Sequence, residues 1–84
     1  MNKRKLLLQI LNNRKNVKYS DFIALLEAYG FVRTRSSGSH TIFKNDRVKE
    51  IINIQNVNSE VKPYQIKQFF SLIEKYNLKM EEGS

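Results

Sequence analysis

The sequence has no cysteine, one histidine and one proline among its 84 residues. Without cysteine the chain can form neither disulfide bonds nor thiolate metal sites, which is typical of proteins of the reducing cytoplasm, where we expect this one. The basic and apolar start, residues 1–11, is short and interrupted by Gln9, so it does not predict a secretion signal. No apolar run approaches the roughly 20 residues of a membrane-spanning helix, and we expect no membrane contact.

The signatures of several enzyme classes are missing as well. His40 has no cysteine and no nearby pair of carboxylates with which to complete a zinc site, so we expect neither a metal nor a cofactor. There is no Walker-type phosphate loop and no GxSxG motif, which nucleotide hydrolases and esterases usually carry. What remains for chemistry is one imidazole beside cationic side chains.

Basic residues outnumber acidic ones by 15 to 8, which gives a net charge of +7 and a pI near 9.9. Residues 1–49 carry 11 of the basic and 3 of the acidic side chains, whereas residues 50–84 carry 4 and 5. This excess favours a polyanionic partner, and nucleic acid above all. The alternative, a basic surface that only keeps the protein in solution, stays open at this point.

Apolar residues recur at helical spacing in three segments, residues 2–12, 22–29 and 66–73. Ser20 or Asp21 is the predicted N-cap of the second helix, because a short side-chain oxygen can accept a hydrogen bond from the first-turn amides. Between the second and third helices the apolar period changes to two, which predicts strands at residues 31–35, 40–44 and 50–55 with a turn at 36–39. The order predicts an α+β fold, a three-stranded antiparallel sheet covered on one face by two helices.

His40 follows the predicted turn directly. In strand periodicity Arg33 and Arg35 share one face, and the hairpin brings them close to His40. We expect these arginines and Lys44 to hold a phosphate while the imidazole moves protons near neutral pH. Metal-free RNA cleavage needs these parts, a base for the 2′-hydroxyl, cations for the transition state and an acid for the leaving 5′-oxygen.

The strand that starts at His40 can face the helices in two ways. His40 shares its parity with Ile42 and Lys44, whereas Thr41 shares its parity with Phe43. We favour Phe43 inward and His40 on the open face or rim, because burying Lys44 would cost several kcal/mol unless it were paired. With Ile42 inward instead, Lys44 could still escape at the strand end.

The run GFVRTRSSGSHTIF, preceded by FIALLEAYG, resembles the signature of the HicA family of bacterial type II toxins. That signature is a helix, Gly-Phe, a basic strand, and Gly-Ser-His opening the next strand. The later INIQNVNSEVKPYQIKQFFSLIEKY is similar to the family's strand, loop and final helix. The resemblance implies a double-stranded-RNA-binding-like α-β-β-β-α fold, ribosome-independent mRNA cleavage, and neutralisation by an antitoxin of the HicB type.

The resemblance also assigns residues. The family's catalytic histidine falls on His40, and the preceding glycine and serine fall on Gly38 and Ser39. Many members have a second histidine or an apolar residue next, where this chain has Thr41. If that second histidine supplies the acid in relatives, the acid here must come from elsewhere, either Lys44 or water.

Length and composition predict a single domain over residues 1–84. The resemblance covers a toxin-like core at residues 17–78 and leaves an N-terminal helical extension at 1–16. The remaining residues, 79–84, include an acidic end and are expected to form a flexible tail.

The leading hypothesis is a metal-independent endoribonuclease toxin with His40 as general base or acid. The residues expected to contact RNA are Arg33, Arg35, Gly38, Ser39, Lys44, Lys62 and Lys67. The alternative is a noncatalytic RNA-binding module, since the same α+β layout can read duplex RNA by shape alone. A third hypothesis, a degenerate toxin kept for antitoxin binding, has Thr41 as its only support.

Overall fold

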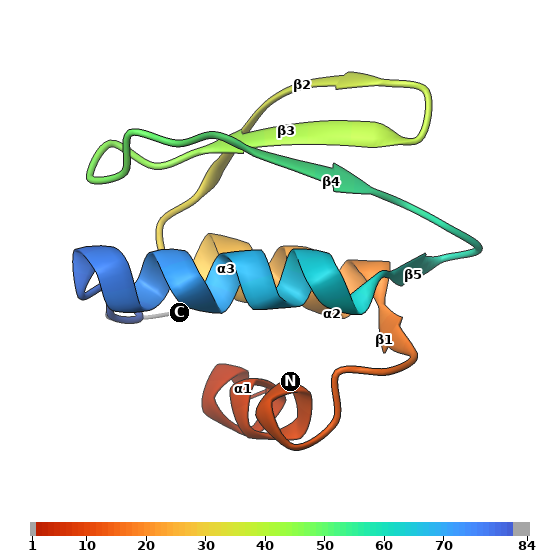
Figure 1. Ribbon diagram of the computed structural model, residues 1–84, viewed down its shortest axis with the longest axis horizontal. Coiled ribbons are helices and arrows are strands. Elements are labelled where there is room, and N and C mark those ends of the chain that lie inside the picture. The colour runs from red at the N-terminus through yellow and green to blue at the C-terminus, as the bar shows by residue number, and fades with distance from the viewer. Residues whose placement is uncertain (1, 82–84) are drawn as a thin grey trace.

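The computed structural model describes residues 2–81, which contain three helices and two small antiparallel sheets. In chain order the elements are α1 (Lys3–Asn12), β1 (Val17–Lys18), α2 (Tyr19–Ala28), β2 (Val32–Ser37), β3 (His40–Lys44), β4 (Ile52–Gln55), β5 (Glu60–Val61) and α3 (Pro63–Tyr76). Figure 1 shows three layers, with the sheet β2-β3-β4 above, α2 and α3 side by side beneath it, and α1 below them. The predicted α+β fold with an α-β-β-β-α layout is confirmed.

The two central helices start where β1 and β5 pair with each other. Helix α2 begins at Tyr19 with Lys18 as its N-cap, so the predicted caps are wrong: Ser20 and Asp21 lie inside the first turn. Contacts with a distant segment explain this earlier start of α2. The short strand pair β1–β5 ends here, and the Tyr19 backbone N–H donates to the Ser59 carbonyl at 2.8 Å. Asp21 still contributes, since a carboxylate in the first turn interacts favourably with the helix dipole.

An aromatic cluster around Phe69 of α3 joins the helix pair to the sheet. The Phe69 ring is fully buried and meets Phe22, Tyr29 and Phe31 edge-on, with ring centroids 5.4 to 6.0 Å apart. Such edge-to-face pairs add stability beyond the apolar area that they bury. The sheet contributes the fully buried side chains of Phe43, Ile52 and Ile54 to the same core. The helices therefore cover one face of the sheet and leave the other face open.

The helix α1 packs against the helix pair on the side away from the sheet, as Figure 1 shows. It buries Leu6 and Ile10, and the Asn2 side chain caps it by accepting from the amides of Arg4 and Lys5. The helix predicted over residues 2–12 is therefore confirmed. Its position on the far side of the helices keeps it away from the open face of the sheet.

The outer edge of β4 is covered by a side chain from α3. The side-chain Oε1 of Gln65 accepts from the backbone N–H of Gln55 at 3.1 Å, and its side-chain NH₂ donates to the backbone carbonyl of Asn53. Gln65 is only 3% exposed. An edge strand normally presents unpaired backbone groups, and here one buried amide satisfies two of them and ties the first turn of α3 to β4.

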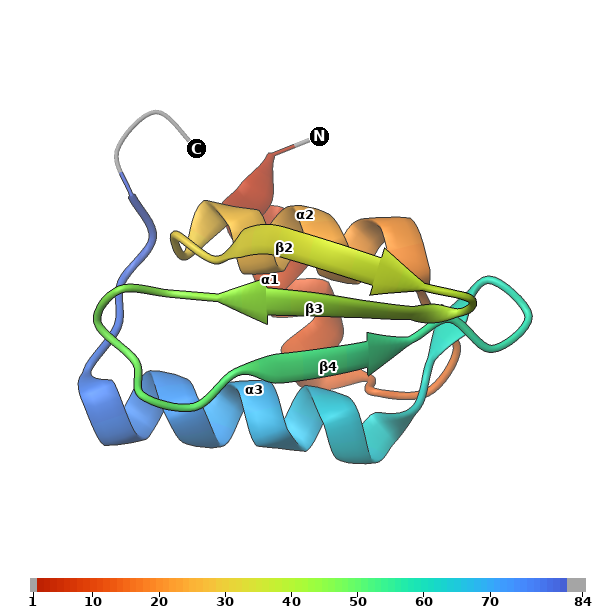
Figure 2. The same ribbon diagram turned by 90° about the horizontal axis from the view of Figure 1, so that it is seen from above.

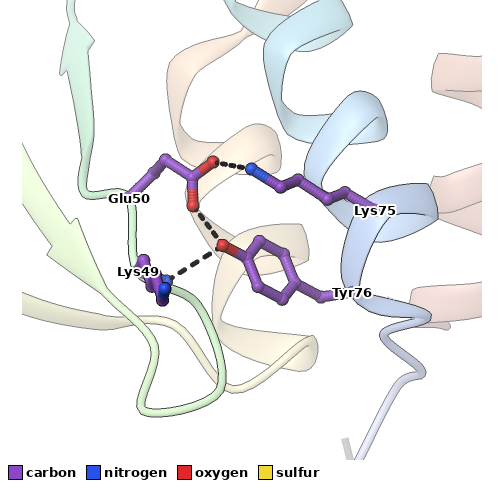
Figure 3. A network of polar contacts seen from close by, with 4 residues as sticks. All are labelled: Lys49, Glu50, Lys75 and Tyr76. Carbon is purple, nitrogen blue, oxygen red and sulfur yellow. Dashed lines mark hydrogen bonds and ion pairs between the residues drawn. The ribbon is translucent and has the colours of Figure 1, made fainter.

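A polar network holds the opposite end of α3 to the loop before β4 (Figure 3). Lys75 lies 2.7 Å from Glu50 in the one ion pair found among residues 2–81, and Tyr76 donates its hydroxyl hydrogen to the same carboxylate. The Lys49 amide donates to the Tyr76 hydroxyl at 3.3 Å. The hydrogen bond from Lys75, followed by that from Tyr76, lowers the pKa of Glu50 to about 2.

The segment after α3 turns back along α2. Asn77 adopts a left-handed conformation with φ of 52°, Leu78 is buried, and the Glu81 amide donates to the Ala28 carbonyl at 2.9 Å. Of the tail predicted to be flexible, residues 82–84 lie outside the described residues. None of the helices within residues 2–81 has the length and hydropathy to cross a membrane.

Candidate functional site

His40 lies on the open face of the sheet, at the start of β3. Phe43 is fully buried against the helices and Thr41 is 6% exposed, whereas His40 is exposed. Because side chains alternate along a strand, His40 and Ile42 project from the face that the helices leave uncovered. The favoured orientation, with Phe43 inward, is confirmed.

A depression of about 410 Å³ surrounds His40 on this face. Its lining is formed by Arg35, Ser37, His40, Ile42 and Asn53. The strand register explains the set, because Ser37 pairs with His40, while Arg35 and Asn53 both pair with Ile42 from either side. A site of this volume lies in the range that small ligands occupy.

The imidazole is hydrogen-bonded on one side only. Nδ1 of His40 lies 3.0 Å from Oδ1 of Asn53. Within residues 2–81 no hydrogen bond to Nε2 is found. Asn53 was not among the predicted site residues. The sequence could have placed Asn53 on the open face, since it stands between two apolar strand residues. Its partner on β3 depends on the strand register, which the sequence does not show.

The prediction that Arg33 and Arg35 share a face is wrong. A β-bulge between them places Arg33 opposite Phe43 and Arg35 opposite Ile42, two adjacent residues that point to opposite faces. The guanidinium of Arg33 lies 5.9 Å from the centre of the Phe43 ring, a cation–π contact. Of the two arginines, only Arg35 lines the depression beside His40.

Lys44 stands apart from the depression. It shares the parity of His40 and is exposed, but it lies at the far end of β3. Four residues of extended chain separate their Cα atoms by about 13 Å. Lys44 is not among the lining side chains, so the alternative that it supplies the acid beside His40 loses support, and water is left.

Thr41, the residue that departs from the HicA pattern, lies on the opposite face from His40. Its hydroxyl oxygen accepts a hydrogen bond from the Tyr19 hydroxyl at 2.8 Å and one from the Ser36 hydroxyl at 3.4 Å. This position therefore joins β3 to α2 beneath the sheet. A side chain here cannot reach a ligand on the open face, so Thr41 gives no support to a degenerate toxin.

The turn before His40 is built on Gly38 and tied down by the loop after β4. Gly38 has φ of +59°, and an added Cβ would meet nothing within 4 Å, so glycine is favoured there by conformation and not by space. The Ser39 carbonyl accepts from the Asn56 amide at 2.8 Å. This contact fixes the hairpin end that presents His40.

The start of α3 lies at the same end of the molecule as the β2–β3 turn, at the right of Figure 2. Lys62 is the N-cap of α3 and Lys67 is exposed on the helix. Neither lysine lines the depression around His40. The predicted cations are therefore not one cluster, since only Arg35 is brought directly beside the imidazole.

Comparison with protein families agrees with this geometry. Residues 19–75, more than half of the chain, match a family described as HicA toxin of bacterial toxin-antitoxin. The matched segment runs from the first residue of α2 to the last turn of α3 and contains the whole depression, whereas α1 lies before it. No curated protein and no solved structure matches the chain. The chain belongs to the HicA family of toxins of bacterial toxin–antitoxin systems.

Proposed function

We propose that the protein is a metal-independent endoribonuclease that cleaves mRNA and that His40 is its catalytic residue. Family membership supports a toxin of the ribonuclease type. The observation that carries the finer proposal is the only histidine of the chain, exposed on the open face of the sheet in a depression that also holds an arginine. No other side chain type in this depression exchanges a proton readily near neutral pH.

The proposed reaction uses the nucleophile that RNA itself supplies. His40 takes the proton of a ribose 2′-hydroxyl, the 2′-oxygen attacks the adjacent phosphorus, and the bond from phosphorus to the 5′-oxygen breaks. Water protonates the leaving 5′-oxygen, and the hydroxide that this leaves takes the proton back from His40. The products therefore end in a 2′,3′-cyclic phosphate and a 5′-hydroxyl. General base catalysis of this kind contributes about 10² to 10⁴ in rate.

Arg35 is the proposed contact of the reacting phosphate. Its guanidinium can donate two parallel hydrogen bonds to phosphate oxygens and offset the charge that grows on them in the transition state. Ser37 pairs with His40 across the hairpin and adds a hydroxyl donor at the same place.

The remaining predicted contacts fit neighbouring nucleotides. Lys44 lies along β3 from His40, and Lys62 and Lys67 stand at the first turns of α3, whose N-terminus carries a partial positive charge. Gly38 and Ser39 offer the backbone of the turn. Arg33 contacts the Phe43 ring, so its proposed role is reduced to a contribution to the general positive field.

The proposed partner is a HicB-like antitoxin in the same cytoplasm. The net charge of +7 favours an acidic binding surface on that partner, because complementary charge accelerates association and selects the partner.

Purified protein incubated with mRNA in EDTA tests the proposal. We expect fragments that end in a 2′,3′-cyclic phosphate, and none from His40→Ala with unchanged circular dichroism. Lys79→Ala, which removes one positive charge far from the depression, is the control and should cleave normally. Full cleavage by His40→Ala would contradict the proposal. RNA that is bound but never cut would support the alternative, a noncatalytic RNA-binding module.

A further inference from the structure

We propose that Asn53 is a positioning residue for this reaction, which selects the tautomer of His40 and makes Nε2 the reacting nitrogen. The inference rests on the proposed function and deepens it. No resemblance and no motif singled out Asn53. The contact that carries it is the 3.0 Å hydrogen bond between Asn53 Oδ1 and His40 Nδ1.

The chemistry of the two groups sets the direction of this bond. An amide oxygen can only accept, so Nδ1 of the ring must donate and must carry the hydrogen. A neutral imidazole has one N–H, so its lone pair then resides on Nε2. Nε2, for which no partner is found among residues 2–81, is therefore the nitrogen that can take a proton from RNA.

The position of Asn53 is fixed from beneath by α3. The Gln65 side chain donates to the backbone carbonyl of Asn53 and accepts from the backbone N–H of Gln55. It therefore holds the backbone on both sides of Ile54. Gln65 is 3% exposed, and its own side chain is held on both polar atoms. The exposed amide that contacts His40 thus belongs to a backbone segment anchored by a buried amide of the neighbouring helix.

A neutral orienting group suits a ring that changes charge. When Nε2 gains a proton, Nδ1 keeps its hydrogen and the bond to Asn53 persists, so the ring keeps its orientation before and after it takes the proton. The charged groups on the same face are Arg35 from β2 and Lys44 on β3, while β4, with the sequence INIQ, contributes none. A carboxylate at position 53 would instead favour the protonated ring.

The tautomer can be measured on the protein alone. We expect the imidazole ¹⁵N chemical shifts of neutral His40 to report hydrogen on Nδ1, and the Asn53→Ala variant to shift the population toward hydrogen on Nε2. The control, Asn12→Ala, removes an exposed asparagine of α1 and should leave the spectrum unchanged. Hydrogen on Nε2 in the unmodified protein would overturn the inference.

Kinetics then test the catalytic consequence. We expect Asn53→Ala to lower kcat about tenfold with KM nearly unchanged, since part of a general-base contribution is lost. Asn53→Asp keeps an acceptor for Nδ1–H and should restore the rate, with the rise of the rate displaced to higher pH. Normal kcat in Asn53→Ala would overturn the role in catalysis. If His40 carries hydrogen on Nδ1 but the protein cuts no RNA, the proposed function is refuted, whereas the assignment of the His40 tautomer still holds.

Discussion

Arg33 and Arg35 are two residues apart on one strand, yet their side chains lie on opposite faces of the sheet. The bulge between them places Arg33 over the Phe43 ring, on the side of the helices, and Arg35 in the depression beside His40. One extra residue in β2 therefore decides which of the two arginines lies beside His40.

The two arginines form a matched pair for mutagenesis. We expect Arg35→Ala to lower kcat for RNA cleavage by about 10 to 100 fold, because it removes a donor to the charge that develops on the phosphate. Arg33→Ala removes the same formal charge and should weaken RNA affinity and its salt dependence with kcat preserved. Single-turnover cleavage with each variant measures this, and equal losses of kcat would contradict the assignment.

Thr41 should matter for stability and not for chemistry. Thr41→Val keeps the shape but leaves the Tyr19 hydroxyl without the acceptor that it has at 2.8 Å, which we expect to cost about 1 to 3 kcal/mol of unfolding free energy. Because the side chain lies beneath the sheet, kcat of the folded variant should match that of the unmodified protein. Urea denaturation and cleavage assays on one preparation separate the two effects, and a stable but inactive variant would contradict this placement.

Gln65 is expected to be the most sensitive polar residue of α3. Gln65→Leu leaves the Asn53 carbonyl and the Gln55 amide without their side-chain partner, at an expected cost of about 1 to 3 kcal/mol. Gln68→Leu, on the exposed side of the same helix, is the control and should change stability by less than about 0.5 kcal/mol. Urea unfolding midpoints compare them, and equal midpoints for the two variants would show that the edge contact carries no stability.

Acid should remove the contribution of the Glu50 network. The folded-state pKa of Glu50, about 2, lies below its ordinary value of 4.5, because Lys75 and Tyr76 donate hydrogen bonds to the carboxylate. The stabilisation is therefore fully present above about pH 4.5 and is lost as the pH falls toward 2. Urea unfolding between pH 2 and 6 should show a flatter pH dependence for Glu50→Gln than for the unmodified protein.

The matched control for this network is Glu74→Gln. Glu74 is exposed on α3 and forms no ion pair within residues 2–81, and its replacement changes the net charge by the same amount. If both variants flattened the pH dependence equally, the effect would come from net charge and not from the network.

Much of the architecture followed from local patterns. The change of apolar period at Gly30 predicts where helix gives way to strand, and the burial cost of a lysine predicts that Phe43 and not Ile42 faces the helices. These inferences hold because side-chain directions repeat regularly along a helix or along a strand without a bulge, such as β3. The start of α2 was different, because the pairing of β1 with β5 moved it ahead of Ser20 and Asp21.

The sequence by itself predicted the three helices and the three strands of the sheet β2-β3-β4 in their order, favoured the buried side of β3, and contained a single imidazole in a basic chain. Only the tertiary structure decided that Arg35 and not Arg33 accompanies His40, that Asn53 contacts the ring of His40, and that Gln65 holds β4 to α3. The physical reason is that a bulge, a strand register and a buried amide pair each depend on contacts between different segments of the chain. Periodicity within one segment carries no information about them.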